Sequence, residues 1–206
     1  TVHYTGLDRD RFRPLQNAGL RRMLGERLGV ALPEKGPLIA TVGALIERKG
    51  QKMGVSALAQ LPDAQLLLVG KGPDEPQLRA LAGELGVAER VHFLGLLDHD
   101  LLPLVLSAAD AMVLPSASEG LANAWVEALA CGTPLVICDV GGARELVRGP
   151  AAGVLVARNS DAVAEGVRMI LRDPPAPRDT AQMVERFGWA EHAEALDAIY
   201  SEIIRR

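Results

Sequence analysis

Short apolar runs alternate with helical segments along most of this 206-residue chain, from Leu38 to about residue 171. Runs such as LLLV and AMVL are apolar throughout, which is typical of strands buried on both faces of a parallel sheet. Strands alternating with helices indicate right-handed crossovers. The pattern therefore predicts an α/β fold: a Rossmann-like, doubly wound sheet of six parallel strands, in three α/β/α layers, with strand order 3-2-1-4-5-6. The expected strands are 38–45, 64–69, 91–94, 110–114, 135–138 and 154–156. The expected helices are 51–61, 75–85, 98–109 (with Asp98 as its cap), 121–131, 144–147 and 161–171.

Composition changes at both ends of this pattern. Residues 1–36 lack strand periodicity and are expected to form a linker and a leading helix at 15–28. Residues 37–173 hold the Rossmann-like domain. A proline-rich stretch then precedes C-terminal helices within 174–206, expected at 180–187 and 189–204, which pack on the domain or reach toward another one. Because the chain opens at Thr1, we expect it to be a part of a longer protein.

Composition also limits the partners of the chain. Only 3% of the residues are aromatic and the net charge is −4, so a nucleic-acid partner is not expected. No apolar stretch approaches the roughly 18 residues of a membrane helix. Cys131 and Cys138 are expected to be buried free thiols, which together with the lack of a signal peptide predicts a cytoplasmic location. The first 30 residues hold six arginines against three carboxylates. This basic segment is expected to face solvent, or to contact phosphates or the inner face of the membrane in the full-length protein.

Two carboxylates bracket a glycine-led turn in the segment Ser118-Glu-Gly-Leu-Ala-Asn-Ala-Trp-Val-Glu127. The segment follows the expected strand 110–114, and ligands of parallel sheets bind at the carboxyl ends of strands. The helix start between the carboxylates offers unpaired N–H groups to an anion. The Cα atoms of Glu119 and Glu127 are expected on the order of 10–12 Å apart, whereas glycosidase carboxyl groups stand about 5–9.5 Å apart. The spacing indicates separate roles on an elongated ligand with an anionic middle.

Basic and glycine-rich loops follow the other strands. Arg48 and Lys49 lie after the first strand, where they neutralise a diphosphate or form a solvated turn. Lys71 lies in a glycine loop after the second strand, where it assists a phosphate or base or belongs to a plain turn. The P-loop and the dinucleotide fingerprint are both absent, which disfavours an ATPase of that type and a dehydrogenase. The histidines show no metal-ligand spacing, so no metal is expected.

Several motifs occur together in one order: Val42-Gly43, Arg48-Lys49-Gly50, Leu68-Val-Gly-Lys-Gly72, Arg90-Val-His-Phe-Leu-Gly95, Ala109-Asp110, and Pro115-Ser through Glu119-Gly120 to Glu127-Ala-Leu-Ala-Cys-Gly-Thr-Pro134. With these motifs the chain closely resembles the carboxyl-terminal, nucleotide-sugar-binding domain of family-4 (group 1) glycosyltransferases, which have the GT-B fold. Thr5-Gly-Leu-Asp8 also resembles the stretch that enters this domain, with Thr5 in place of the usual asparagine.

The resemblance implies a role for each motif. Glu119 would bind the hydroxyls of the donor sugar, and Glu127 both ribose hydroxyls. Arg48 and Lys49 would hold the diphosphate, although the arginine that commonly follows the glycine is Ala44 here. Catalytic roles would thus fall to Glu119, Arg48 and Lys49. The other donor-binding residues would be Gly43, Lys71, Gly95, Leu96, Gly120, Leu121, Ala122, Asn123 and Glu127.

The resemblance also implies an activity. It is a retaining transfer from a UDP, GDP or ADP sugar in glycan, glycolipid or polysaccharide synthesis, without a metal or a prosthetic group. An acceptor sugar or lipid-linked acceptor would bind a missing amino-terminal domain, so this chain alone should turn over little. Two other classes stay open: a GT-B nucleotide-sugar 2-epimerase and a noncatalytic nucleotide-sugar binding module.

Overall fold

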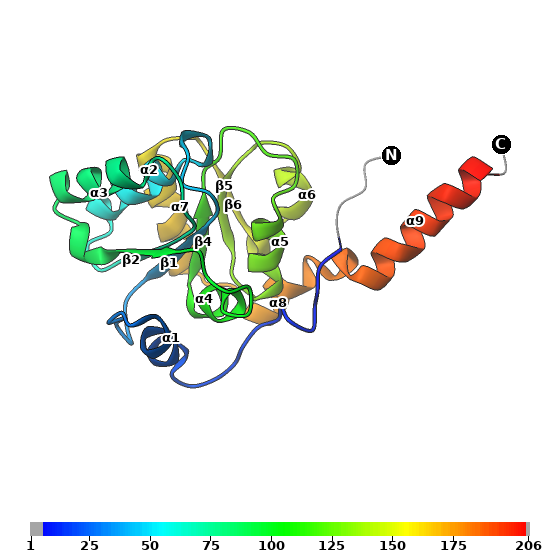
Figure 1. The fold of residues 1–206 in the computed structure, drawn as a ribbon, viewed down its shortest axis with the longest axis horizontal. Coiled ribbons are helices and arrows are strands. Elements are labelled where there is room, and N and C mark those ends of the chain that lie inside the picture. Colours follow the sequence, from blue (N-terminus) through cyan, green and yellow to red (C-terminus); the bar gives the residue numbers. More distant parts are fainter. Residues whose placement is uncertain (1–5, 205–206) are drawn as a thin grey trace.

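The chain forms a six-stranded parallel sheet in the order β3-β2-β1-β4-β5-β6, as the sequence predicted. The computed structural model describes residues 6–204 and is shown in Figure 1. Every neighbouring pair of strands is parallel. The strands are β1 (Leu38–Val42), β2 (Gln65–Val69), β3 (Val91–Gly95), β4 (Ala111–Leu114), β5 (Leu135–Cys138) and β6 (Gly153–Val156).

Helices cover both faces of this sheet (Figure 1). Successive strand residues point to opposite faces, so Leu38 and Ala40 join one apolar cluster while Ile39 joins the other. The cluster that contains Ile39 is covered by α2 (Gln51–Ala57), α3 (Glu75–Glu84) and α7 (Ser160–Arg172). The opposite face is covered by α1 (Leu20–Leu28), α4 (Leu102–Ala108), α5 (Asn123–Ala130), α6 (Ala143–Leu146) and α8 (Pro177–Gln182). Together these layers form the expected α/β/α sandwich.

Several element boundaries differ from the prediction. The first strand ends at Val42 rather than Leu45, because Gly43 turns the chain with φ 152°. The predicted helix 98–109 begins only at Leu102, and Asp98 is not its cap: the main-chain carbonyl of Asp98 accepts the Leu101 N–H in a preceding turn. The predicted helix 15–28 begins at Leu20, after a left-handed Gly19.

Three other predicted helices also have different bounds. The predicted helix 121–131 begins at Asn123, because Ala122 is extended. The predicted helix 51–61 is α2 followed by a 3₁₀ turn, η2 (Leu58–Gln60). The predicted helix 180–187 is α8, which starts three residues earlier at a proline, followed by the turn η5 (Glu185–Phe187).

The leading segment (residues 6–19) packs against the sheet domain. Leu7 and Phe12 are buried in the apolar cluster on the α4 and α5 face. The Leu7 N–H donates to the carbonyl of Phe187 at 2.6 Å, and Leu7 forms a parallel bridge with Gly188. The start of the described chain therefore meets the segment just before the last helix, at one side of the domain.

The last helix, α9 (Trp189–Ile204), extends away from the sheet domain (Figure 1). Large apolar side chains stay exposed along it, namely Trp189, Tyr200, Ile203 and Ile204. Among the helices of residues 6–204, none combines the length and apolarity that crossing a membrane requires. The predicted bounds of this helix, 189–204, agree with the structure.

Candidate active site

Glycine-rich loops at the ends of β1, β2 and β3 lock together at the carboxyl edge of the sheet. The Gly43 N–H donates to Val69, and the Gly70 N–H donates to the carbonyl of Gly95 at 2.7 Å. A Cβ atom on Gly70 would overlap the carbonyl of Gly43, so the two loops approach as closely as glycine allows. The Lys71 stem lies over Gly95, with Cε 3.3 Å from where a Cβ would be. The structure thus brings Gly43, Lys71 and Gly95 together.

The predicted catalytic residues form one charged cluster. Lys49 Nζ lies 2.6 Å from Glu119 Oε1, and Arg48 Nη1 lies 3.5 Å from Glu119 Oε2. The Glu119 side chain is only 8% exposed and that of Lys49 15%. Arg48 also donates to the carbonyl of Ser118, and the Ala117 N–H donates to the carbonyl of Arg48 at 2.7 Å. Two cations therefore compensate one buried carboxylate, which leaves one net positive charge at this edge.

These contacts join two turns that are about 70 residues apart in sequence. Arg48 and Lys49 belong to η1 (Glu47–Lys49), a 3₁₀ turn after β1, and Glu119 belongs to the loop between β4 and α5. A Cβ atom on Gly50 would overlap the carbonyl of Pro115, so only glycine permits this approach. The close packing makes the cationic turn and the carboxylate loop a single unit.

The loop that carries Glu119 leads into the amino terminus of α5. Ala122 is extended and no side chain caps the helix, and the Trp125 N–H donates to the carbonyl of Ala122 at 3.0 Å. The N–H groups of Asn123 and Ala124 therefore lie where a helix start can bind an anion. Gly120 is exposed, and Leu121, Ala122 and Asn123 run from the carboxylate to the helix start. The Gly142 N–H donates to the carbonyl of Gly120 at 2.7 Å, and a Cβ on Gly141 would overlap the carbonyl of Glu119. The loop after β5 therefore fixes the path of this segment.

The second carboxylate, Glu127, lies farther along α5 and faces a histidine. Its Oε1 atom is 3.7 Å from His99 Nε2, and its side chain is 13% exposed. Burial raises the pKa of Glu127, and His99 opposes that rise. His99 Nδ1 in turn lies 2.9 Å from Arg11 Nη1 of the leading segment. This arrangement was not predicted, because His99 belongs to neither a periodic pattern nor a motif.

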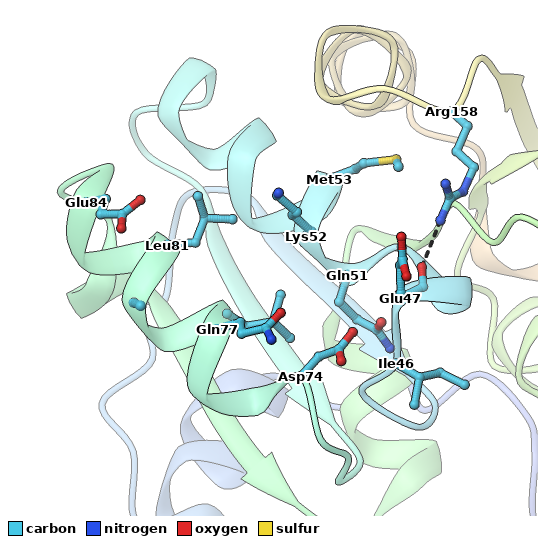
Figure 2. Close-up of a pocket in the computed structure, with 13 residues that line it drawn as sticks. Ile46, Glu47, Gln51, Lys52, Met53, Asp74, Gln77, Leu81, Glu84 and Arg158 are labelled. Atoms are coloured by element: carbon cyan, nitrogen blue, oxygen red, sulfur yellow. Dashed lines mark hydrogen bonds between the residues drawn. The ribbon is translucent and has the colours of Figure 1, made fainter.

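Arg158 is a second residue that the sequence did not indicate. It lies between β6 and α7, where its Nε donates to the carbonyl of Pro115 at 3.1 Å and its Nη2 to that of Glu47 at 2.8 Å. Figure 2 shows the guanidinium group reaching the Glu47 backbone. Arg158 thus ties the cationic turn to the residue that follows β4.

A hollow of about 590 Å³ lies behind the cationic turn, between α2 and α3 (Figure 2). Its lining includes Glu47, Lys52, Asp74 and Gln77, but none of Arg48, Lys49, Glu119 or Glu127. The charged cluster and this hollow are therefore separate features. Within residues 6–204, no group of three or more histidine, cysteine, aspartate or glutamate residues is arranged to hold a metal ion.

The family model for glycosyl transferases group 1 matches residues 26–187. The 2-deoxystreptamine glucosyltransferase of Streptomyces kanamyceticus is 37% identical over 160 residues, which cover 75% of this chain and 41% of that protein. The D-inositol 3-phosphate glycosyltransferase of Mycobacterium leprae (strain Br4923) is 34% identical over 216 residues, covering 98% of this chain and 49% of that protein. The chain thus spans less than half the length of these two relatives.

Solved structures share the same architecture. Sucrose-phosphate synthase from Thermosynechococcus elongatus aligns with a TM-score of 0.84 and 31% identity, over 98% of this chain and 52% of that one. Anabaena Alr3699/HepE in complex with UDP and glucose aligns with a TM-score of 0.82 and 27% identity, over 98% of this chain and 56% of that one.

Proposed function

The chain belongs to the group 1 glycosyltransferases, and we propose that it is the domain that binds the nucleotide-sugar donor in a retaining sugar transfer. The observation that carries this proposal is the charged edge of the sheet. There the Lys49–Glu119 pair, the uncapped start of α5 and the second carboxylate, Glu127, follow one another. An anion in the middle with hydroxyl groups at both ends matches this order of charges.

The donor is proposed to lie along this edge in one direction. Its sugar hydroxyls face Glu119 and the Gly120–Asn123 segment, its diphosphate meets Lys49, Arg48 and the first N–H groups of α5, and its ribose meets Glu127. The base rests against main-chain groups of Gly95, Leu96 and Leu97, next to Lys71 and Gly43. Main-chain recognition of the base accounts for the lack of a side-chain signature there.

The transfer step that fits this placement breaks the bond between the sugar anomeric carbon and the diphosphate oxygen. The bonding electrons leave with the diphosphate, whose growing negative charge is stabilised by Lys49, Arg48 and the α5 amino terminus. The acceptor hydroxyl attacks from the same face, and its proton passes to an oxygen of the leaving diphosphate. Lys49 then interacts with both Glu119 and the phosphate. One cation therefore contacts the carboxylate that binds the sugar and the leaving group of that sugar.

The donor class is proposed as a UDP, GDP or ADP sugar. Structures of the similar Alr3699/HepE contain UDP and UDP-glucose. A relative from Mycolicibacterium smegmatis, 36% identical over 181 residues, is named as GDP-mannose-dependent. Calorimetric titration of this chain with the three classes of nucleotide sugar tests the proposal. We expect one base to bind at least about tenfold more tightly than the others, which equals about 1.4 kcal/mol. Binding of none of them would contradict the donor role.

The acceptor site is proposed to lie on an amino-terminal domain of the full-length protein, which α9 contacts through its exposed apolar residues. The acceptor is a sugar or a lipid-linked sugar in glycan, glycolipid or polysaccharide synthesis, at the cytoplasmic face of the membrane. Assays with the full-length protein and with residues 1–206 test this division. We expect both to bind donor and only the full-length protein to transfer sugar. Epimerisation of the donor without any acceptor would instead indicate a 2-epimerase.

A further inference from the structure

Three side chains from separate parts of the chain lie next to one another in a row that ends at Glu127. Arg11 of the leading segment reaches His99 in the loop before α4, and His99 reaches Glu127 on α5. The ring of Phe12, which is buried, lies edge-on to the imidazole with 5.1 Å between ring centroids. The imidazole is therefore held on one side by a guanidinium group and on a second by an aromatic ring.

The contact with Arg11 fixes where the imidazole carries its proton. A guanidinium group has only N–H donors, so His99 Nδ1 at 2.9 Å must accept. A neutral imidazole that accepts at Nδ1 carries its hydrogen on Nε2. That Nε2–H faces the Glu127 carboxylate at 3.7 Å. His99 thus presents an N–H donor at Nε2 to Glu127.

Two aspartates beside this row of side chains hold Arg11 in place. Asp100 Oδ1 lies 3.3 Å from Arg11 Nε, and Asp8 Oδ2 lies 4.0 Å from the same atom. Directly after the helix that carries Glu127, burial raises the pKa of Cys131 to about 12, so this thiol stays neutral. Burial also raises the pKa of Glu127, and His99 is the group that opposes this rise. An ionised carboxylate accepts hydrogen bonds at both oxygens, whereas protonation turns one oxygen into a donor.

We propose that His99 is a positioning residue for Glu127: its Nε2–H orients the carboxylate and favours its ionised form for the ribose hydroxyls, while Arg11 selects the tautomer that does so. This inference rests on the proposed function, in which Glu127 binds ribose. It extends the site to a residue later in the loop between β3 and α4 and to one of the leading segment. The affinity for ribose then depends on how the leading segment packs against the sheet domain.

The test compares ribose recognition with total affinity. The probes are UDP, GDP or ADP, whichever this chain binds most tightly, and its 2′,3′-dideoxy analogue. The Kd of the dideoxy analogue divided by the Kd of the ribonucleotide reports the ribose contact alone. We expect His99→Ala to lower this ratio about three- to tenfold, the net effect of one typical intramolecular polar contact, with the dideoxy Kd changed less than about twofold. His99→Gln, which restores an N–H donor, should recover most of the ratio, and Arg11→Met should lower it.

The pH profile of ribonucleotide affinity gives a second readout. Affinity should fall as Glu127 becomes protonated, and in His99→Ala the midpoint should move to higher pH because burial then acts unopposed. Asp98→Asn, a charge change on the neighbouring exposed residue, serves as the control and should leave the ratio unchanged. A wild-type ratio and midpoint in His99→Ala would overturn this inference alone. Failure of the wild-type chain to bind any of the three nucleotides would overturn the proposed function, and this inference with it.

Discussion

Lys49 and Glu119 form an ion pair at 2.6 Å, and both side chains are largely buried at the edge of the sheet where the donor is proposed to bind. The pair has a structural role as well as the proposed chemical one, since without Lys49 the buried Glu119 would have only the more distant Arg48 to compensate its charge. The residues that hold the two turns together are therefore the residues that are proposed to act on the donor.

Replacing Lys49 alone should destabilise the fold. Lys49→Met leaves Glu119 with only the more distant Arg48, and the expected loss is about 1–3 kcal/mol in the free energy of unfolding. The double variant Lys49→Met, Glu119→Gln removes both charges and should recover part of that loss. Urea denaturation measures both values, and a single variant as stable as wild type would show that the pair contributes nothing.

The two carboxylates should separate in their effects on ligands. Glu119→Gln should leave the affinity for the nucleoside diphosphate nearly unchanged, but weaken nucleotide-sugar binding and lower kcat of the full-length enzyme by about 100-fold or more. Glu127→Gln should weaken both ligands equally, because both carry the ribose. Titrations with each ligand distinguish these patterns, and transfer at the wild-type rate by Glu119→Gln would refute its assigned role.

Gly141 should resist substitution where another loop glycine does not. Its φ is 51° and a Cβ would overlap the carbonyls of Glu119 and Gly120, so Gly141→Ala should cost about 1–3 kcal/mol and weaken donor binding. Gly149→Ala is the matched control, because its backbone is extended and nothing lies within 4 Å of the new methyl group. Thermal denaturation and donor titration of the two variants should differ clearly.

Arg158→Met should loosen the cationic turn without touching the ribose contact. It removes two hydrogen bonds to the carbonyls of Glu47 and Pro115, so nucleoside diphosphate affinity should fall by about three- to tenfold. The ratio between ribo- and dideoxynucleotide affinity should stay at its wild-type value. Arg172→Met, on an exposed arginine of α7, is the control for loss of one positive charge. Equal affinities of the two variants would exclude a role for Arg158 in the turn.

Glu127 should lower stability at neutral pH. Since its pKa in the folded state lies above the ordinary glutamate value of about 4.3, the folded protein binds the proton more tightly than the unfolded chain. Stability therefore falls as pH rises from about 4.3 through the raised pKa. Glu127→Gln should raise Tm at pH 7, and this gain should shrink as the pH falls toward 4. Thermal scans over this range check the sign, and a lower Tm at pH 7 would contradict it.

Most of the fold could be predicted from the sequence because apolar periodicity is a local signal. Strand order followed from six buried runs that alternate with helices, whereas strand and helix ends depended on backbone turns that composition does not encode. Gly43 ends β1 three residues early, and Asp98 contributes its carbonyl rather than its side chain. Such details are decided by contacts between loops.

The predicted site residues came from strand-end loops and a family motif, and the structure brings Arg48, Lys49 and Glu119 into contact. Their mutual pairing was not predicted, because it depends on side-chain directions across about 70 residues of sequence. His99, Arg11 and Arg158 were missed for the same reason. Each acts through contacts between distant parts of the chain and repeats no pattern.

The bridge between Leu7 and Gly188 brings the incoming and outgoing chain segments side by side. If the proposed amino-terminal domain is attached through both segments, its links to this one lie along a single line. Two adjacent links of this kind act as a hinge. They permit rotation of one domain about that line and resist translation along it. Opening and closing of the two domains over the donor would then be a rotation about one axis. Substitutions at Leu7 or Gly188 would alter the range of this rotation without changing the donor-binding residues.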